Sequence, residues 1–299
     1  MKRIFALLIA LLMVLSLAAC GEEKRASKKD KDDKKETAVA TVAPTESEPA
    51  TDAPVNADEN TIFSTADYAL TVTDVNFEDS YYGIEILVKA ENFTTDKEYT
   101  IMLENFTVNG LQAEGICYIE IGAGEVKNEN ASVAMDFLDM AGIETVEGFE
   151  ATFYIIDEDY NTLETQTFTY GVNTQYTRDA QSTDVVLVDD KTAKITLVEK
   201  TWDEYAGYEL ILYAENFTTN ELYLDIENVT INGEEYDAYL GTTIMPGFST
   251  YDDCTFYGYE LEEMGITSEA DIKEIKFDLV VEDRDNFEDL STTPVTVKP

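Results

Sequence analysis

The sequence of 299 residues has no histidine, only three cysteines and six prolines, and 20 lysines and arginines against 62 aspartates and glutamates. Without histidine, Ser-His-Asp and Cys-His catalytic groups and histidine metal centres cannot form. With a net charge of −42, the chain also lacks the basic surface that binds nucleic-acid phosphates. We therefore expect neither an enzyme nor a nucleic-acid-binding protein, although a pair of carboxylates could still hydrolyse glycosides.

Long hydrophobic runs are missing except at the N-terminus. Lys2 and Arg3 precede an apolar stretch, 4–17, that only Ser16 interrupts. About 14 residues are too few to cross the ~30 Å hydrocarbon core of a bilayer comfortably as a helix. A basic start followed by a short apolar stretch is instead typical of a signal peptide.

The apolar stretch ends in LAAC, residues 17–20, which resembles the lipobox of bacterial lipoproteins. The resemblance implies that 1–19 are a lipoprotein signal peptide and that Cys20 carries a lipid anchor. It places the protein outside the cell, anchored to the outer face of the bacterial cytoplasmic membrane. The alternative is an ordinary secretory signal in which Cys20 has no role.

The next segment, 20–60, has a composition that cannot form a hydrophobic core. It contains KRASKKDKDDKKE followed by TAVATVAPTESEPATDAP, which offers little apolar area to offset the entropy lost on folding. We expect a disordered tether between the lipid anchor and the folded part.

The hexapeptide AENFTT occurs twice, at 90–95 and at 214–219. The match extends in both directions: LENFTVNG corresponds to IENVTING, and AGI to MGI. Ala90 and Glu158 are 68 residues apart, as are Ala214 and Glu282. Agreement over this length indicates a tandem duplication. Each copy, at about 110 residues, is long enough to bury its own core.

Both copies alternate apolar and polar residues with a period of two, as in IEILVKA (84–90), which is typical of strands with one buried face. Asn-Gly at 109–110 and at 232–233 predicts tight hairpins. The only helical signals are LDMAGI (138–143) and ELEEMGI (260–266). We expect an all-β protein of two antiparallel β-sandwiches. AENFTT is then a turn after a core strand, with its phenylalanine packed underneath.

These features, the Asn-Gly hairpin, the Met-Gly-Ile turn and the acidic turn before the last strand, resemble the tandem immunoglobulin-like repeats of uncharacterised Gram-positive surface lipoproteins. The resemblance covers 61–171 and 185–298, with 172–184 as a linker. It implies fold and location, and no activity.

Two sets of residues are candidate sites. Asp157, Asp159 and Asn161 in the first copy, and Asp283 and Asp285 in the second, have oxygen ligands at alternate positions, as calcium prefers. The surroundings do not match an EF-hand, so they are weak metal candidates, and we expect no cofactor. Exposed Tyr and Trp make low-entropy contact surfaces. A ligand surface in the second copy would contain Trp202, Tyr205, Tyr236 and Tyr239, although strand packing explains them as well.

Cys117 and Cys254 lie at different positions of the two copies, so neither copy has a cysteine pair. We expect two buried free thiols. The function that fits best is a monomeric, non-catalytic binding or adhesion module for a protein or glycan. The alternatives are a calcium-dependent or structural spacer of the cell envelope, and an accessory protein that presents a ligand to a surface enzyme or transporter.

Overall fold

The computed structural model describes residues 60–77, 82–172, 174, 176–203 and 206–299. The predicted signal peptide and nearly all of the predicted tether, Cys20 included, lie outside these residues. The described residues all belong to one compact unit. We call 61–171 segment one and 185–298 segment two. No helix in the described part of the chain is both long and apolar enough to cross a bilayer.

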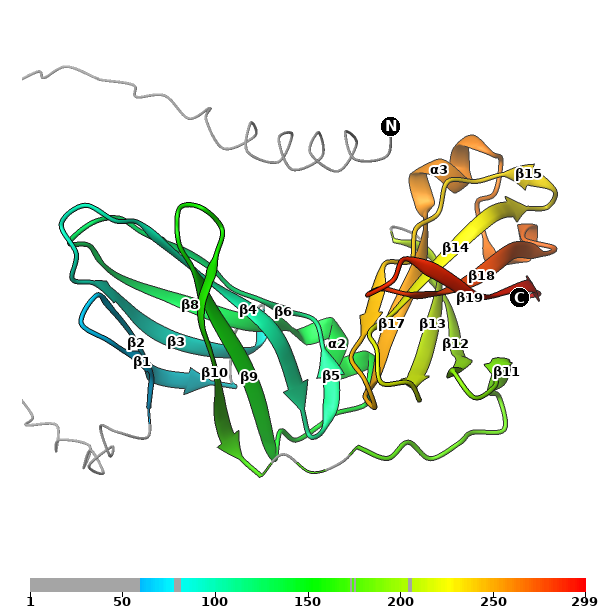
Figure 1. Cartoon of the computed structure of the whole chain (residues 1–299). Coiled ribbons are helices and arrows are strands. Elements are labelled where there is room, and N and C mark those ends of the chain that lie inside the picture. The colour runs from blue at the N-terminus through cyan, green and yellow to red at the C-terminus, as the bar shows by residue number, and fades with distance from the viewer. Residues whose placement is uncertain (1–59, 78–81, 173, 175, 204–205) are drawn as a thin grey trace, which may run out of the picture. The chain divides into compact units, whose positions relative to one another are not determined.

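Segment one forms the first sheet and half of the second (Figure 1). The strands of the first sheet follow in spatial order: β1 (Thr61–Ser64), β2 (Tyr68–Asn76), β3 (Tyr82–Asn92), β8 (Val126–Ala134) and β6 (Gly115–Ile116). The segment-one strands of the second sheet are β10 (Thr162–Gly171), β9 (Gly148–Ile156), β4 (Tyr99–Val108) and β5 (Leu111–Ala113), with β7 (Tyr118–Ile121) also paired to β4.

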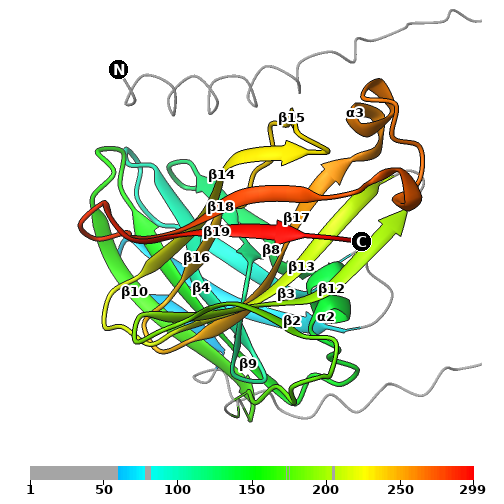
Figure 2. The same cartoon turned by 90° about the vertical axis from the view of Figure 1, so that its right-hand side faces the viewer.

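Segment two supplies the rest of the second sheet and all of the third, in which β14, β18 and β19 run side by side (Figure 2). The second sheet continues through β17 (Ser249–Tyr257), β13 (Gly207–Asn216), β12 (Ala193–Asp203) and β11 (Val185–Asp189). The third contains β15 (Glu234–Glu235), β14 (Leu222–Ile231), β18 (Ile275–Asp283) and β19 (Glu288–Val297), with β16 (Thr242–Ile244) beside β14.

The protein is all-β with sandwich-like domains, as the alternating pattern predicts. Every second residue of β9 and of β18 is buried, and these inward side chains fill two hydrophobic clusters, one between the sheets of each segment. Burial of apolar area is the main stabilising term of such cores. The short helices α2 (Met135–Met140) and α3 (Gly258–Glu263), with a 3₁₀ turn at Glu269–Asp271, occur at or beside the predicted helical signals.

The Asn-Gly hairpins are also confirmed. Asn109 and Asn232 have φ of 50° and 56°, and each is followed by a glycine with positive φ. Two successive residues in the left-handed region make the tight turn whose twist matches the flanking strands, and asparagine and glycine tolerate this conformation best.

The repeated AENFTT turn has a different interior from the one the sequence predicts. Asn92 and Asn216 are each only 2% exposed, whereas Phe93 and Phe217 are 52% and 51% exposed. The prediction that the phenylalanine packs underneath is therefore wrong. Inward positions in β3 alternate through Val88 and Ala90 to Asn92, so the next residue faces outward. The asparagine amide is tolerated inside because all of its polar atoms have partners.

The two segments share the second sheet, which the sequence does not predict. β5 and β17 are parallel and pair only at Gln112 and Thr250, whereas the other paired strands of the described chain are antiparallel. One residue pair thus joins two half-sheets that otherwise belong to separate sandwiches. The domain boundaries at 171 and 185 stay a prediction.

Candidate binding pocket

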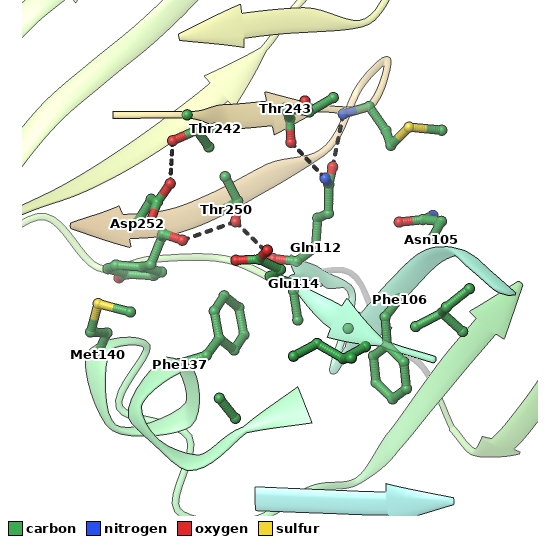
Figure 3. Close-up of a pocket in the computed structure, with 18 of the residues that line it drawn as sticks. Asn105, Phe106, Gln112, Glu114, Phe137, Met140, Thr242, Thr243, Thr250 and Asp252 are labelled. Atoms are coloured by element: carbon green, nitrogen blue, oxygen red, sulfur yellow. Dashed lines mark hydrogen bonds between the residues drawn. The ribbon is translucent and has the colours of Figure 1, made fainter. Parts of the chain in front are cut away.

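A pocket of about 450 Å³ lies where β5 meets β17 (Figure 3). Segment one lines it with β4, β5, β6, α2 and the last residue of β8. Segment two lines it with β16, β17, and the residues next to β14 and β18, Glu221 and Arg284. Pockets for small ligands typically have volumes of about 300–1,000 Å³ and often form at domain interfaces. The volume of this pocket falls within that range, and the pocket lies where the two segments meet.

Gln112 of β5 holds one side of the pocket together. Its Nε2 donates to the carbonyl oxygen of Thr243 (2.8 Å), and its Oε1 accepts from the backbone N–H of Met245 (2.8 Å). The hydroxyl of Thr250 donates to the Gln112 carbonyl oxygen (2.9 Å). Figure 3 shows this side chain reaching from β5 to segment two. The amide thus attaches β5 to β16 and to the loop after it, and the bond from Thr250 attaches β5 to β17.

Aromatic side chains of segment two also pack against segment one beside the pocket. Tyr213 and Tyr251 are neighbours on β13 and β17, their ring centroids are 5.0 Å apart, and each residue is only 7% exposed. Both belong to the hydrophobic cluster of segment one, as does Ile211. The face of β13 and β17 that points away from the core of segment two is thus covered by segment one.

The corresponding positions in segment one are polar. Lys89 on β3 pairs with Asn128 on β8 at the places that Tyr213 and Tyr251 occupy on β13 and β17. Asn128 is exposed and Lys89 is half-exposed. This difference between otherwise matching strands is the sequence signal for the contact between segments. It could have been found by asking where the second copy exchanges polar residues for aromatic ones.

The predicted linker, 172–184, takes part in the contact. The hydroxyl of Tyr176 lies 3.2 Å from that of Tyr251 and 3.4 Å from the carbonyl oxygen of Ala141 in segment one. Arg178 donates two hydrogen bonds of 2.7 Å to the Asp184 carboxylate, and this pairing lowers the pKa of Asp184 to about 2. The guanidinium also lies 5.6 Å from the centre of the Tyr213 ring. These contacts attach the linker to both segments.

The pocket is strongly anionic. Six carboxylates line it against one guanidinium: Glu104, Glu114, Asp136, Glu221, Asp252 and Asp253, with Arg284. The guanidinium lies 5.1 Å from the centre of the Tyr223 ring, which partly engages it. A cationic group would find several unlike charges here. Three of them, Glu221, Asp252 and Asp253, are partly buried, and Coulomb attraction is stronger there than in open water.

Asp252 is a partly buried carboxylate of this lining whose pKa is perturbed. Burial raises its pKa, and the nearby charges of Asp253 and Glu114 raise it further, whereas a hydrogen bond from the Thr242 hydroxyl lowers it. Like charges and desolvation both disfavour the ionised form. A bound cation would relieve this repulsion. Apolar surface from Phe106, Phe137 and Met140 completes the lining.

The residues predicted as a ligand surface do not line this pocket. Trp202 and Tyr236 pack against the hydrophobic cluster of segment two. The hydroxyl of Tyr236 accepts from the backbone N–H of Tyr257 (2.8 Å). Tyr239 is exposed, and its hydroxyl lies 3.1 Å from that of Tyr223. Tyr205 lies outside the described residues. Their role as a ligand surface stays a prediction.

Two of the predicted metal candidates, Asp157 and Asp283, cap turns, and the others donate backbone hydrogen bonds to them. Asp157 accepts hydrogen bonds from the backbone N–H groups of Asp159 (3.0 Å) and Asn161 (2.9 Å), and these bonds lower its pKa. Asp283 accepts in the same way from the backbone of Asp285 (3.0 Å), and its pKa is lowered as well, mainly by Asn286. Across the described ranges, no three His, Cys, Asp or Glu side chains are placed to hold a metal ion.

The two remaining cysteines, Cys117 and Cys254, are buried free thiols, as expected. Burial raises the pKa of each to about 12. A thiol that stays protonated is a poor nucleophile.

Comparison with known proteins identifies no family. No model of a protein family matches the chain, and no curated protein matches its sequence. Among solved structures, a transglutaminase of red sea bream matches 79% of the chain at 9% identity with a TM-score of 0.23, and the match spans 31% of that enzyme.

An exo-chitosanase of Amycolatopsis orientalis gives a TM-score of 0.23 at 9% identity, over 75% of this chain and 26% of the enzyme. The YadV chaperone gives 0.23 at 11% identity, over 78% of this chain and 100% of its own. The chain thus spans less than a third of the two enzymes. At these TM-scores the likenesses carry no functional argument.

Proposed function

We propose that the protein is a non-catalytic, lipid-anchored binding protein on the outer face of the bacterial cytoplasmic membrane, and that the pocket at the joint of the two segments holds a positively charged ligand. The single observation that carries the proposal is the lining of this pocket, six carboxylates contributed by both segments. A site divided between two segments suits an accessory protein that presents its ligand to a surface enzyme or transporter.

Titration calorimetry at low ionic strength with the triamine spermidine tests the pocket. We expect saturable binding, one molecule per chain, that weakens about tenfold when Glu114→Gln and Asp253→Asn are combined, because each removes one opposing charge. Affinity should also fall as the pH is lowered through the raised pKa of Asp252, since protonation removes a further negative charge.

The matched control is Glu262→Gln with Glu263→Gln on α3. These two carboxylates are exposed and outside the pocket, and the total charge changes by the same amount. Affinity should change less than about twofold, as expected for distant screened charges. No saturable binding of spermidine, or an equal loss in both double variants, contradicts the proposed site.

The proposed location depends on Cys20 and has its own test. Cells expressing the chain should incorporate labelled palmitate into it, and Cys20→Ser should abolish the label and release the protein from the membrane fraction. One lipid chain alone holds a protein only marginally at a membrane, and the multiply acylated cysteine of a lipoprotein anchors it stably. Palmitate labelling that survives Cys20→Ser would show that the anchor is elsewhere or absent.

A second candidate function is adhesion through exposed aromatic side chains. Tyr257 and Tyr259 are both exposed, and their rings stack with centroids 5.9 Å apart. Such a pair offers contact area at low entropic cost to a protein or a sugar. Replacing both by Ser should then weaken binding of wall material without affecting spermidine.

A further inference from the structure

The edge of β17 that lines the pocket has almost no strand beside it. β17 pairs with β13 along its whole length on one side, and on the other it pairs with β5 at Thr250 alone. In segment one, β6 covers the matching part of β8, where Gly115 pairs with Val133 and Ile116 pairs with Ser132. No described strand covers the equivalent stretch of β17, residues 251–257.

Side chains substitute for the missing strand. The backbone N–H of Asp253 donates to the carboxylate of the preceding residue, Asp252 (2.9 Å), and that of Tyr257 donates to the hydroxyl of Tyr236 (2.8 Å). These donors lie two pleats apart on one strand, so they point to the same side. Unpaired backbone groups on a strand edge are a template for adding another strand.

The N-terminal part of this edge, 251–253, opens into the anionic pocket, and 254–257 continue beyond its lining. Tyr251, Asp252 and Asp253 of β17 line it, and Glu114 and Ile116 line it from segment one. Seven residues of β17 span about 23 Å at the usual ~3.3 Å per residue, enough for a peptide of five or six residues. The carboxylates on both sides favour a basic sequence over an acidic or neutral one.

We propose that the pocket accepts an extended basic peptide segment, which pairs with the edge of β17 as an added strand while its Lys or Arg side chains meet the pocket carboxylates. The inference rests on the proposed function, because it names the class of ligand for the same site. Main-chain hydrogen bonds to a strand edge give affinity in this mode, and alternate side chains give specificity. The added strand would displace the side chains of Asp252 and Tyr236 from the backbone N–H groups of β17 that they now bond.

Three labelled hexapeptides test the proposal by fluorescence anisotropy: alternating Lys-Val, the same sequence N-methylated at alternate backbone nitrogens, and alternating Glu-Val. We expect the Lys-Val peptide to bind, the N-methylated peptide to bind at least tenfold more weakly, and the Glu-Val peptide not to bind. The protein is unchanged throughout, so its folding is not in question. Glu114→Gln with Asp253→Asn should weaken the Lys-Val peptide about tenfold, and the α3 double variant less than twofold.

Equal affinities of the N-methylated and parent peptides would overturn strand addition. So would a Lys-Val peptide that fails to bind, or one whose affinity is the same for the original chain and the pocket variant. If spermidine still binds in those cases, the proposed function stands and only this inference falls. If neither spermidine nor any peptide binds, the proposed function falls with it.

Discussion

Replacing Asn216 by Ala should lower the free energy of unfolding by about 3–5 kcal/mol, measured by urea denaturation. The buried Nδ2 donates to the carbonyl oxygens of Asn220 and Ile244 (2.9 Å each), and Oδ1 accepts from the N–H and hydroxyl of Thr218 (2.8 Å each). Alanine leaves these groups without their side-chain partner. An unsatisfied buried polar group costs about 1–3 kcal/mol, and several are affected together.

The neighbouring residue supplies the control. Phe217→Ala alters the next position of the same turn and removes more atoms, yet its side chain is half-exposed, so we expect a loss of at most about 1 kcal/mol. Asn92→Ala should resemble Asn216→Ala, because Asn92 donates to Lys97 and Ile121 and accepts from Thr94 in the same pattern. If Phe217→Ala costs more than Asn216→Ala, the amide is not what stabilises this turn.

Combining Tyr213→Lys with Tyr251→Asn should separate the unfolding of the two segments. Loss of a buried aromatic side chain costs about 3–5 kcal/mol, and here both rings lie in the contact between segments. Lysine would also place a second positive charge near Arg178, whose guanidinium lies over the Tyr213 ring. Scanning calorimetry should give one transition for the original chain, and two for the variant, with the first at least 8 °C lower.

The introduced residues are those that segment one carries at the same strand positions, Lys89 and Asn128, so the strands themselves should tolerate them. The reciprocal variant, Lys89→Tyr with Asn128→Tyr, is the control. Its positions face solvent, and the surface ion pair from Lys89 to Glu91 (2.8 Å) is worth at most about 1 kcal/mol. A single transition at an unchanged temperature in the first variant would show that the segments are not coupled through these rings.

Sequence alone predicts the elements whose causes are local. The Asn-Gly pairs specify the hairpins because few residues accept a left-handed backbone, and the alternation in 84–90 specifies a strand with one buried face. The error at AENFTT arises from ranking Phe93 above Asn92 by hydrophobicity. Strand alternation decides which side chain points inward, and an amide with a complete set of partners can occupy that position.

The pocket could not be predicted because it forms where segment one covers a face of segment two, and sequence patterns do not identify the partner of a face. Periodicity shows that the inner face of β13 is buried, and says nothing of a partner for the outer face. Only the exchange of Lys89 and Asn128 for Tyr213 and Tyr251 pointed to a contact. The carboxylates that meet in the pocket come from strands, loops and a helix far apart in the sequence, in a chain with 62 acidic residues. Nothing in the sequence separates these six carboxylates from the other acidic residues.

The most direct test of a ligand site at the joint of the two segments is hydrogen exchange, followed by mass spectrometry, of the full chain with and without the Lys-Val peptide. Added peptide should slow exchange in 251–257 of β17 and in 112–116 across the pocket, and leave the hairpin at 157–161 unchanged. Slower exchange only in α3 or in that hairpin, with 251–257 unaffected, would contradict the account.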